Sequence, residues 1–145
     1  MKRSLFTLLL TTALALGPAF AAEESDSEVN ARKIALDLAG AFSNDGFKLR
    51  DGHWTGTFAP GKAAIHQVNL FAGNEYWFSL GATDKAKKVA VTVFNENGKP
   101  LSYEPYQDGA SAAAGFSPAI SGPYLIKIEV IEGAPASFCL LYSFK

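Results

Sequence analysis

The sequence predicts an all-β fold, an antiparallel sandwich or barrel with one N-terminal amphipathic helix. From Phe47 onward, apolar residues alternate with polar ones at a period of two, which is typical of half-buried strands. Short segments rich in Gly, Pro and Asn separate these runs, as they do in all-β domains. A hydrophobic content of 48% with 12% aromatic residues argues against a disordered chain.

The first residues have the three-part layout of a secretory signal peptide. Met1-Lys2-Arg3 is positively charged, residues 5–16 form an apolar core, and Ala19-Phe20-Ala21 places small residues before a cleavage site. The apolar core is shorter than the about 20 residues of a membrane span, and no later stretch is long and apolar enough. We therefore expect residues 1–21 to be removed and a soluble protein without a membrane span to reach the periplasm or the medium. The alternative is a buried N-terminal helix.

Charge and cysteine content narrow the classes of protein further. The chain has 13 Lys and Arg against 14 Asp and Glu, and loss of Lys2 and Arg3 with the leader leaves 11 against 14, a net charge of −3. A nucleic-acid-binding protein normally has a basic excess, so we expect no nucleic-acid partner. Cys139 is the single cysteine, which excludes an intramolecular disulfide and favours a small buried residue over a reactive thiol.

Residues 22–46 are predicted to form an acidic segment followed by the helix. Ser25, with Glu28 three residues later, fits a capping box. Apolar side chains then recur at helical spacing at Ala31, Ile34, Ala35, Leu38 and Phe42. The Ser-Asn-Asp-Gly segment at 43–46 ends the helix. We expect the apolar stripe to dock on the domain, with a partner or a membrane surface as the alternative.

Residues 47–145 are predicted to form the β-domain. Alternation marks strands within residues 68–70, 76–80, 89–93, 124–130 and 138–142. The Asn-Glu-Asn-Gly segment at 95–98 is a strong hairpin signal. We expect the small-residue-rich segment at 110–115 to be a loop that leads into a strand.

Three segments in order resemble the bacterial pre-peptidase C-terminal domain family. They are Gly-Thr-Phe-Ala-Pro-Gly at 56–61 with Ala-Gly-Asn-Glu-Tyr-Trp-Phe at 72–78, Val-Thr-Val-Phe-Asn-Glu-Asn-Gly-Lys-Pro-Leu at 91–101, and Phe-Ser-Pro-Ala-Ile-Ser-Gly-Pro-Tyr at 116–124. The resemblance implies a jelly-roll-like β-sandwich that usually accompanies exported enzymes and is not itself catalytic. Some relatives carry calcium, but the Asp-Lys-Ala-Lys-Lys segment at 84–88 suits a divalent cation poorly, so we expect no metal.

Aromatic residues outside the expected core are the candidate binding residues. In a regular strand Trp77 points away from the Tyr76 and Phe78 face, so it either lies under the helix or contacts a sugar or a partner. The polar and aromatic loop at Tyr103, Tyr106 and Asp108 suits carbohydrate or protein contact, or plain solvation.

Two further positions carry weaker signals. We expect Trp54 either to anchor the helix on the sandwich or to line a small site with His53. His66 shares a face with Val68 and Leu70, which favours a hydrogen-bonded core histidine over a general base.

The sequence contains no Gly-x-Ser-x-Gly, no His-Glu-x-x-His, no glycine-rich phosphate loop and no Cys/His cluster with zinc spacing. We therefore expect an exported, non-catalytic module that needs no cofactor. The first hypothesis is binding to another exported protein. The alternative is a carbohydrate-binding module that uses Trp77, Tyr103 and Tyr106. An enzyme would require two titratable side chains that converge in a cleft.

Overall fold

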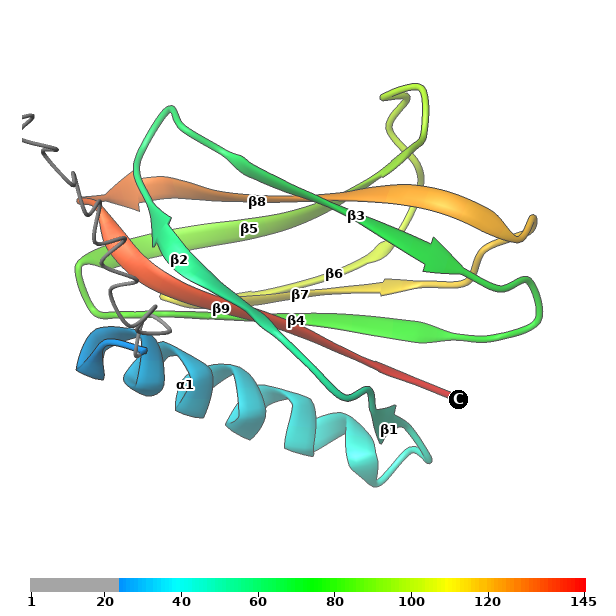
Figure 1. The fold of residues 1–145 in the computed structure, drawn as a ribbon, viewed down its shortest axis with the longest axis horizontal. Coiled ribbons are helices and arrows are strands. Elements are labelled where there is room, and N and C mark those ends of the chain that lie inside the picture. Colours follow the sequence, from blue (N-terminus) through cyan, green and yellow to red (C-terminus); the bar gives the residue numbers. More distant parts are fainter. Residues whose placement is uncertain (1–23) are drawn as a thin grey trace, which may run out of the picture.

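The computed structural model describes residues 24–145, which form one helix and nine strands (Figure 1). In chain order these are α1 (Asp26–Ser43), β1 (Lys48–Leu49), β2 (Trp54–Phe58), β3 (Ala64–Leu70), β4 (Tyr76–Ala82), β5 (Ala86–Asn95), β6 (Glu104–Asp108), β7 (Ser111–Phe116), β8 (Gly122–Gly133) and β9 (Ala136–Phe144). The predicted signal peptide, residues 1–21, lies outside the described residues.

The strands form two sheets that pack face to face (Figure 1). The larger sheet has the order β1-β9-β4-β7-β6, with β2 also paired to β9, and the smaller has the order β3-β8-β5. Every pairing between these strands is antiparallel. The predicted all-β antiparallel sandwich with one N-terminal helix is confirmed.

The core lies between the sheets and follows the alternation of the strands. Phe78 of β4, Ile126 of β8 and Leu140 of β9 are fully buried there. Because successive side chains of a strand point to opposite faces, Trp77 lies on the outer face of the larger sheet, as the sequence predicts.

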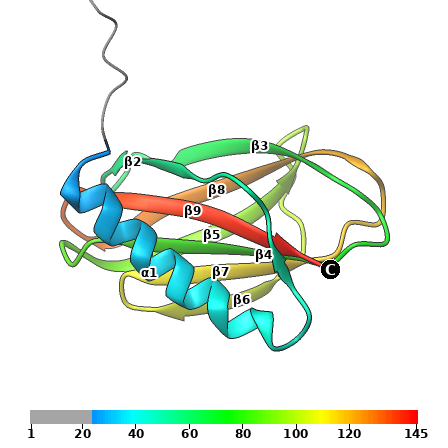
Figure 2. The ribbon, with the colours of Figure 1, turned by 60° about the horizontal axis from the view of Figure 1, so that its bottom comes forward.

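Helix α1 lies across that outer face (Figure 2). It begins at the predicted capping box, in which the backbone N–H of Ser25 donates to Glu28 Oε2 at 2.9 Å and the N–H of Glu28 donates to Ser25 Oγ at 3.2 Å. The predicted docking of the helix is confirmed. The side chains buried deepest are alanines, which pack with β9: Ala31, Ala35 and Ala39 on the helix, Cys139 and Leu141 on the strand.

Small side chains let the helix approach the sheet closely. A Cβ added at Gly81 of β4 would stand 2.5 Å from the carbonyl oxygen of Ala31 and 2.5 Å from the backbone nitrogen of Ala35. Glycine at position 81 therefore sets the distance between α1 and β4.

Two local expectations differ from the structure. Residues 111–116 form strand β7 rather than a loop, because Ala112 and Ala114 pack into the core while β7 pairs with both β4 and β6. The 95–98 turn closes only a short hairpin, with a single bridge between Phe94 and Pro100. The Asn95 N–H donates to the Lys99 carbonyl at 2.9 Å, and the Leu101 N–H donates to the Val93 carbonyl at 3.0 Å. The chain then crosses to the larger sheet as β6.

No helix within residues 24–145 combines the length and the hydropathy that crossing a membrane requires.

Candidate functional site

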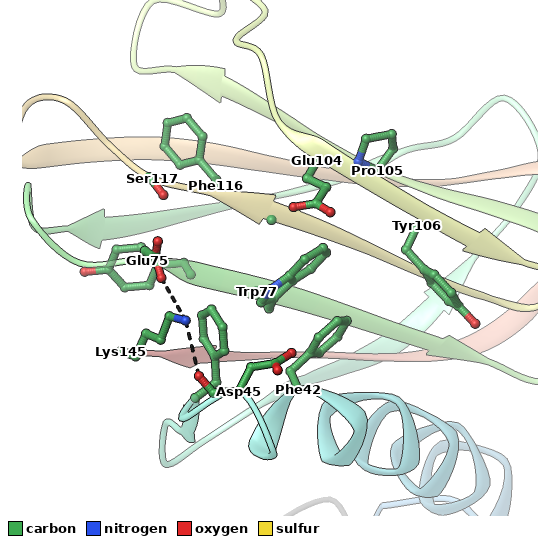
Figure 3. Close-up of a pocket in the computed structure, with 13 residues that line it drawn as sticks. Phe42, Asp45, Glu75, Trp77, Glu104, Pro105, Tyr106, Phe116, Ser117 and Lys145 are labelled. Atoms are coloured by element: carbon green, nitrogen blue, oxygen red, sulfur yellow. Dashed lines mark hydrogen bonds and ion pairs between the residues drawn. The ribbon is translucent and has the colours of Figure 1, made fainter.

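A groove of about 770 Å³ opens on the outer face of the larger sheet, between the C-terminal end of α1 and the edge strand β6 (Figure 3). We call it the α1–β6 groove. Strands β4 and β7 form its floor, and the helix end, the loop after it and β6 form its walls. Six aromatic residues line it: Phe42, Phe47, Tyr76, Trp77, Tyr106 and Phe116.

Both faces of the Trp77 indole are occupied. The Phe42 ring of α1 stacks on it with centroids 4.2 Å apart and an interplanar angle of 6° (Figure 3). A Cβ at Gly115 would stand 2.9–3.1 Å from Cζ2, Cη2 and Cε2 of the indole, and such similar distances place Gly115 against the ring face. A phenyl ring stacked at 4.2 Å leaves no room for Gly115 on the same face, so Phe42 and Gly115 lie on opposite faces of the indole. The helix therefore covers Trp77, which was one of the two sequence hypotheses.

Tyr106 is the exposed aromatic residue of the groove, with 41% of its surface accessible. It lies on β6 opposite Ala113, and Glu104 and Asp108 share its face of the strand. The predicted loop is thus an edge strand from position 104 onward. The structure brings Trp77 and Tyr106 together, while Asp108 lies farther along β6 and does not line the groove.

The rim of the groove is acidic. Asp45, Glu75 and Glu104 line it together with a single cation, Lys145. Lys145 Nζ lies 3.1 Å from Glu75 Oε2 and donates to the backbone oxygen of Asp45 at 3.2 Å (Figure 3). The carboxylates of Asp45 and Glu104 form no ion pair with any residue of the described chain. The lining side chains therefore carry a net charge of −2.

The sequence alone does not identify most of the residues that line the groove as parts of one site. The sequence indicates Phe42 only as part of the apolar stripe of the helix, and it gives no local signal for Lys145. They meet because β4 pairs with β9 and because the helix ends beside these strands.

Tyr103 and Trp54 lie away from the groove. Tyr103 is half-buried and packs against the core. Trp54 packs on the inner face of the larger sheet, where its ring lies 5.1 Å from that of His66 and 6.1 Å from that of Tyr142. The expectation that Trp54 anchors the helix is wrong, because its ring contacts are within the sandwich. It lines a second cavity instead.

His66 faces the core of the sandwich, as predicted, but not as a hydrogen-bonded histidine. Its Nε2 is buried and has no hydrogen-bond partner among residues 24–145. Loss of water around the ring lowers the pKa of His66, which favours the neutral imidazole.

Cys139 is buried beneath α1, as predicted. Burial raises the pKa of its thiol to about 12; the negative charge of Glu24 adds to this and the positive charge of Arg32 opposes it. A thiol with so high a pKa is a poor nucleophile at neutral pH.

No protein-family model and no curated protein matches the chain. Within the described part of the chain, no group of three or more His, Cys, Asp and Glu residues is placed to hold a metal ion. The resemblance to the pre-peptidase C-terminal domain stays a prediction.

Proposed function

We propose that the protein is an exported, non-catalytic module that binds another exported protein through the α1–β6 groove. The observation that supports this proposal is the groove itself, in which Trp77, Phe42 and the exposed Tyr106 form an aromatic centre with carboxylates at its rim. Aromatic residues surrounded by a polar rim are the usual composition of protein interfaces.

The charge of the groove indicates the chemistry of the partner. Asp45 and Glu104 are carboxylates without ion-pair partners in the described chain, and Asp108 adds a third on the same face of β6. Opposite charges steer two proteins together and exclude partners of like charge. We therefore infer a partner that presents lysine or arginine side chains.

The contacts of Trp77 favour a protein over a glycan as the ligand. A sugar ring stacks on an open aromatic face, but Phe42 and Gly115 occupy both faces of the indole. Of the aromatic residues proposed for carbohydrate binding, Tyr106 alone is exposed in the groove, since Tyr103 packs against the core.

The proposal of export depends on the sequence of residues 1–21. Protein recovered from the periplasm or the medium should begin at Ala22, because the signal peptidase cleaves after the small residue at position 21. Intact mass and N-terminal sequencing measure this directly. Protein that keeps Met1 and stays in the cytoplasm would contradict export.

Site-specific photo-crosslinking in the producing cell tests the binding surface. With a photo-reactive phenylalanine at position 106, we expect an adduct with one exported protein. Position 65, which is 60% exposed on the outer face of the smaller sheet, serves as the control and should give no such adduct.

Charge reversal then tests the chemistry. Asp45→Lys should abolish the adduct, because it replaces an acidic rim residue by a cation. Asp37→Lys, the same change at an exposed helix position outside the groove, should leave it intact. Equal adducts from positions 65 and 106, or an adduct indifferent to Asp45→Lys, would contradict the proposal.

A further inference from the structure

A second cavity, of about 560 Å³, opens at the edge of the sandwich between the two sheets. We call it the inter-sheet pocket. Its lining comes from the β1–β2 connection with Arg50, from β2 with Trp54, from β3 and the loop after it, and from β4 and β9. Small-molecule sites in proteins have volumes of roughly 300–1,000 Å³ and are mostly apolar with a few convergent polar groups.

One wall of the inter-sheet pocket is aromatic. The Trp54 and Tyr142 rings are nearly parallel, at an interplanar angle of 17° with centroids 6.1 Å apart. Tyr76 meets Tyr142 edge to face, also at 6.1 Å. Such a wall suits a flat or cyclic apolar group.

A cation without an acidic partner stands at this wall. The Arg50 guanidinium lies over the Tyr142 ring, 5.0 Å from its centroid, and the Arg50 backbone N–H donates to the Tyr142 carbonyl at 3.0 Å. No aspartate or glutamate lines the pocket, and Arg50 forms no ion pair with any residue from 24 to 145. Its side chain makes one long hydrogen bond, of 3.5 Å, to the Asp51 carbonyl. The guanidinium is therefore available to an anion.

The hydroxyl of Tyr76 adds a second donor. Its Oη accepts hydrogen bonds from the Phe71 backbone N–H at 2.9 Å and from Asn74 Nδ2 at 3.2 Å. These two bonds use both lone pairs of the oxygen, so the hydroxyl proton is left to donate. All three of these residues line the pocket.

Tyr142 keeps its own proton as well. Burial raises the pKa of Tyr142, with Arg50 opposing and Tyr76 adding to the rise. A neutral phenol can donate a hydrogen bond to an anion, whereas a phenolate would repel it. Arg50, Tyr76 and Tyr142 thus give this pocket an excess of donors over acids.

We propose that the inter-sheet pocket binds a small aromatic carboxylate, with its ring against Trp54 and its carboxylate paired with Arg50. Arginine and a carboxylate form two parallel charge-assisted hydrogen bonds, which a neutral amide cannot reproduce. This site shares only Tyr76 of β4 with the lining of the α1–β6 groove, and it does not depend on the function proposed for the groove.

Phenylacetate is the probe, with phenylacetamide as the neutral molecule of the same shape. The chain has two tryptophans, one in each site, so the two indole N–H signals in a proton–nitrogen NMR spectrum report the sites separately. We expect phenylacetate to shift the Trp54 signal in a saturable way and to leave the Trp77 signal in place. Phenylacetamide should bind at least about tenfold more weakly.

Two variants complete the test. Arg50→Gln should lower the affinity for phenylacetate to that of phenylacetamide, and the exposed position of Arg50 allows the variant to fold. Lys48→Gln removes the same charge from an exposed residue outside the pocket and should leave the affinity unchanged. Equal binding of the two probes, an unchanged affinity in Arg50→Gln, an equal loss in Lys48→Gln, or no saturable shift at Trp54 would each overturn the proposal.

Discussion

His66 shows how the surroundings of one side chain set a property of the folded state. It lies on the inner face of β3 between the rings of Trp54 and Phe138, at 5.1 and 6.1 Å, and its Nε2 is buried without a hydrogen bond to any described residue. A proton taken up there would place a charge in an apolar environment. Burial therefore lowers the pKa of His66 below its ordinary value of 6.5.

From this we expect the free energy of unfolding to fall as the pH falls below 6.5. In that range the unfolded chain binds a proton at His66 that the folded protein does not, so protonation favours unfolding. Urea denaturation of the wild type and of His66→Phe on either side of this pH measures the effect. His66→Phe should flatten the pH dependence, because it removes the titrating ring and keeps an apolar group in the same place.

The matched control for this prediction is His53→Gln. His53 is exposed, and its Nε2 lies 3.4 Å from Glu24 Oε1, so it lacks the apolar surroundings of His66. The variant should retain the loss of stability below pH 6.5. If His66→Phe retains that loss as well, the buried imidazole is not its source.

Prediction of single residues from the sequence succeeded where a local pattern decided the outcome. Alternation along β4 was sufficient to place Trp77 on the outer face. The stacking of Phe42 on Trp77 could not be predicted, because it depends on where α1 crosses the sheet. The sequence could not predict that His66 Nε2 lacks a hydrogen bond either, because the residues around its ring come from β2 and β9.

At the scale of elements, the docking of α1 depends on close packing between small residues. The helix presents Ala31, Ala35 and Ala39 to the sheet, and Gly81 of β4 lies directly beneath its backbone. Cys139 is enclosed in the same contact. The thiol therefore reports whether the helix is docked.

We expect Gly81→Ala to displace the helix and expose Cys139. The added Cβ would stand 2.5 Å from two backbone atoms of α1, which cannot move aside as a side chain can. Overpacking of this kind costs about 1–3 kcal/mol of folding free energy. The rate at which a thiol reagent modifies Cys139 under native conditions should rise well above that of the wild type.

Gly40→Ala is the control for the same chemical change. Gly40 lies on an exposed face of α1. A Cβ added there would have no atom within 4 Å beyond its neighbours in the helix. This variant should stabilise the protein by about 0.5–1 kcal/mol, because alanine favours the helix more than glycine does, and should leave Cys139 protected. Slow modification of Cys139 in Gly81→Ala would show that the helix tolerates the added group.

The elements themselves were predictable to different degrees. The capping box and the stripe located α1. Alternation located β4, β5, β8 and β9, because large apolar residues recur at regular spacing on the face that each strand turns to the core. The sequence did not predict strands β6 and β7. All five residues of β6 are exposed, and β7 consists mainly of alanine and glycine, so neither has an apolar alternation to recognise.

At the scale of the whole molecule, the helix and the sandwich are joined by extensive contacts. α1 packs on β4 and β9, two interior strands of the larger sheet, and these strands also carry core residues such as Phe78 and Leu140. Most of the stability of a helix in a protein comes from the packing of its apolar face, and the apolar face of α1 packs on the sandwich. Loss of the sandwich should therefore melt the helix at the same time.

We predict that the protein unfolds in a single transition, which would make the α1–β6 groove a permanent feature of the folded state. Trp54→Phe leaves Trp77 as the remaining tryptophan, so its fluorescence reports the stacking with Phe42 and hence the docking of the helix. Urea unfolding of this variant, followed by that fluorescence and by far-ultraviolet circular dichroism, should give coincident curves. If the fluorescence changes at a lower urea concentration, the helix leaves the sheet first. That result would uncover one face of the Trp77 indole before the sandwich unfolds, and it would give a sugar ring the stacking surface that the docked helix denies it.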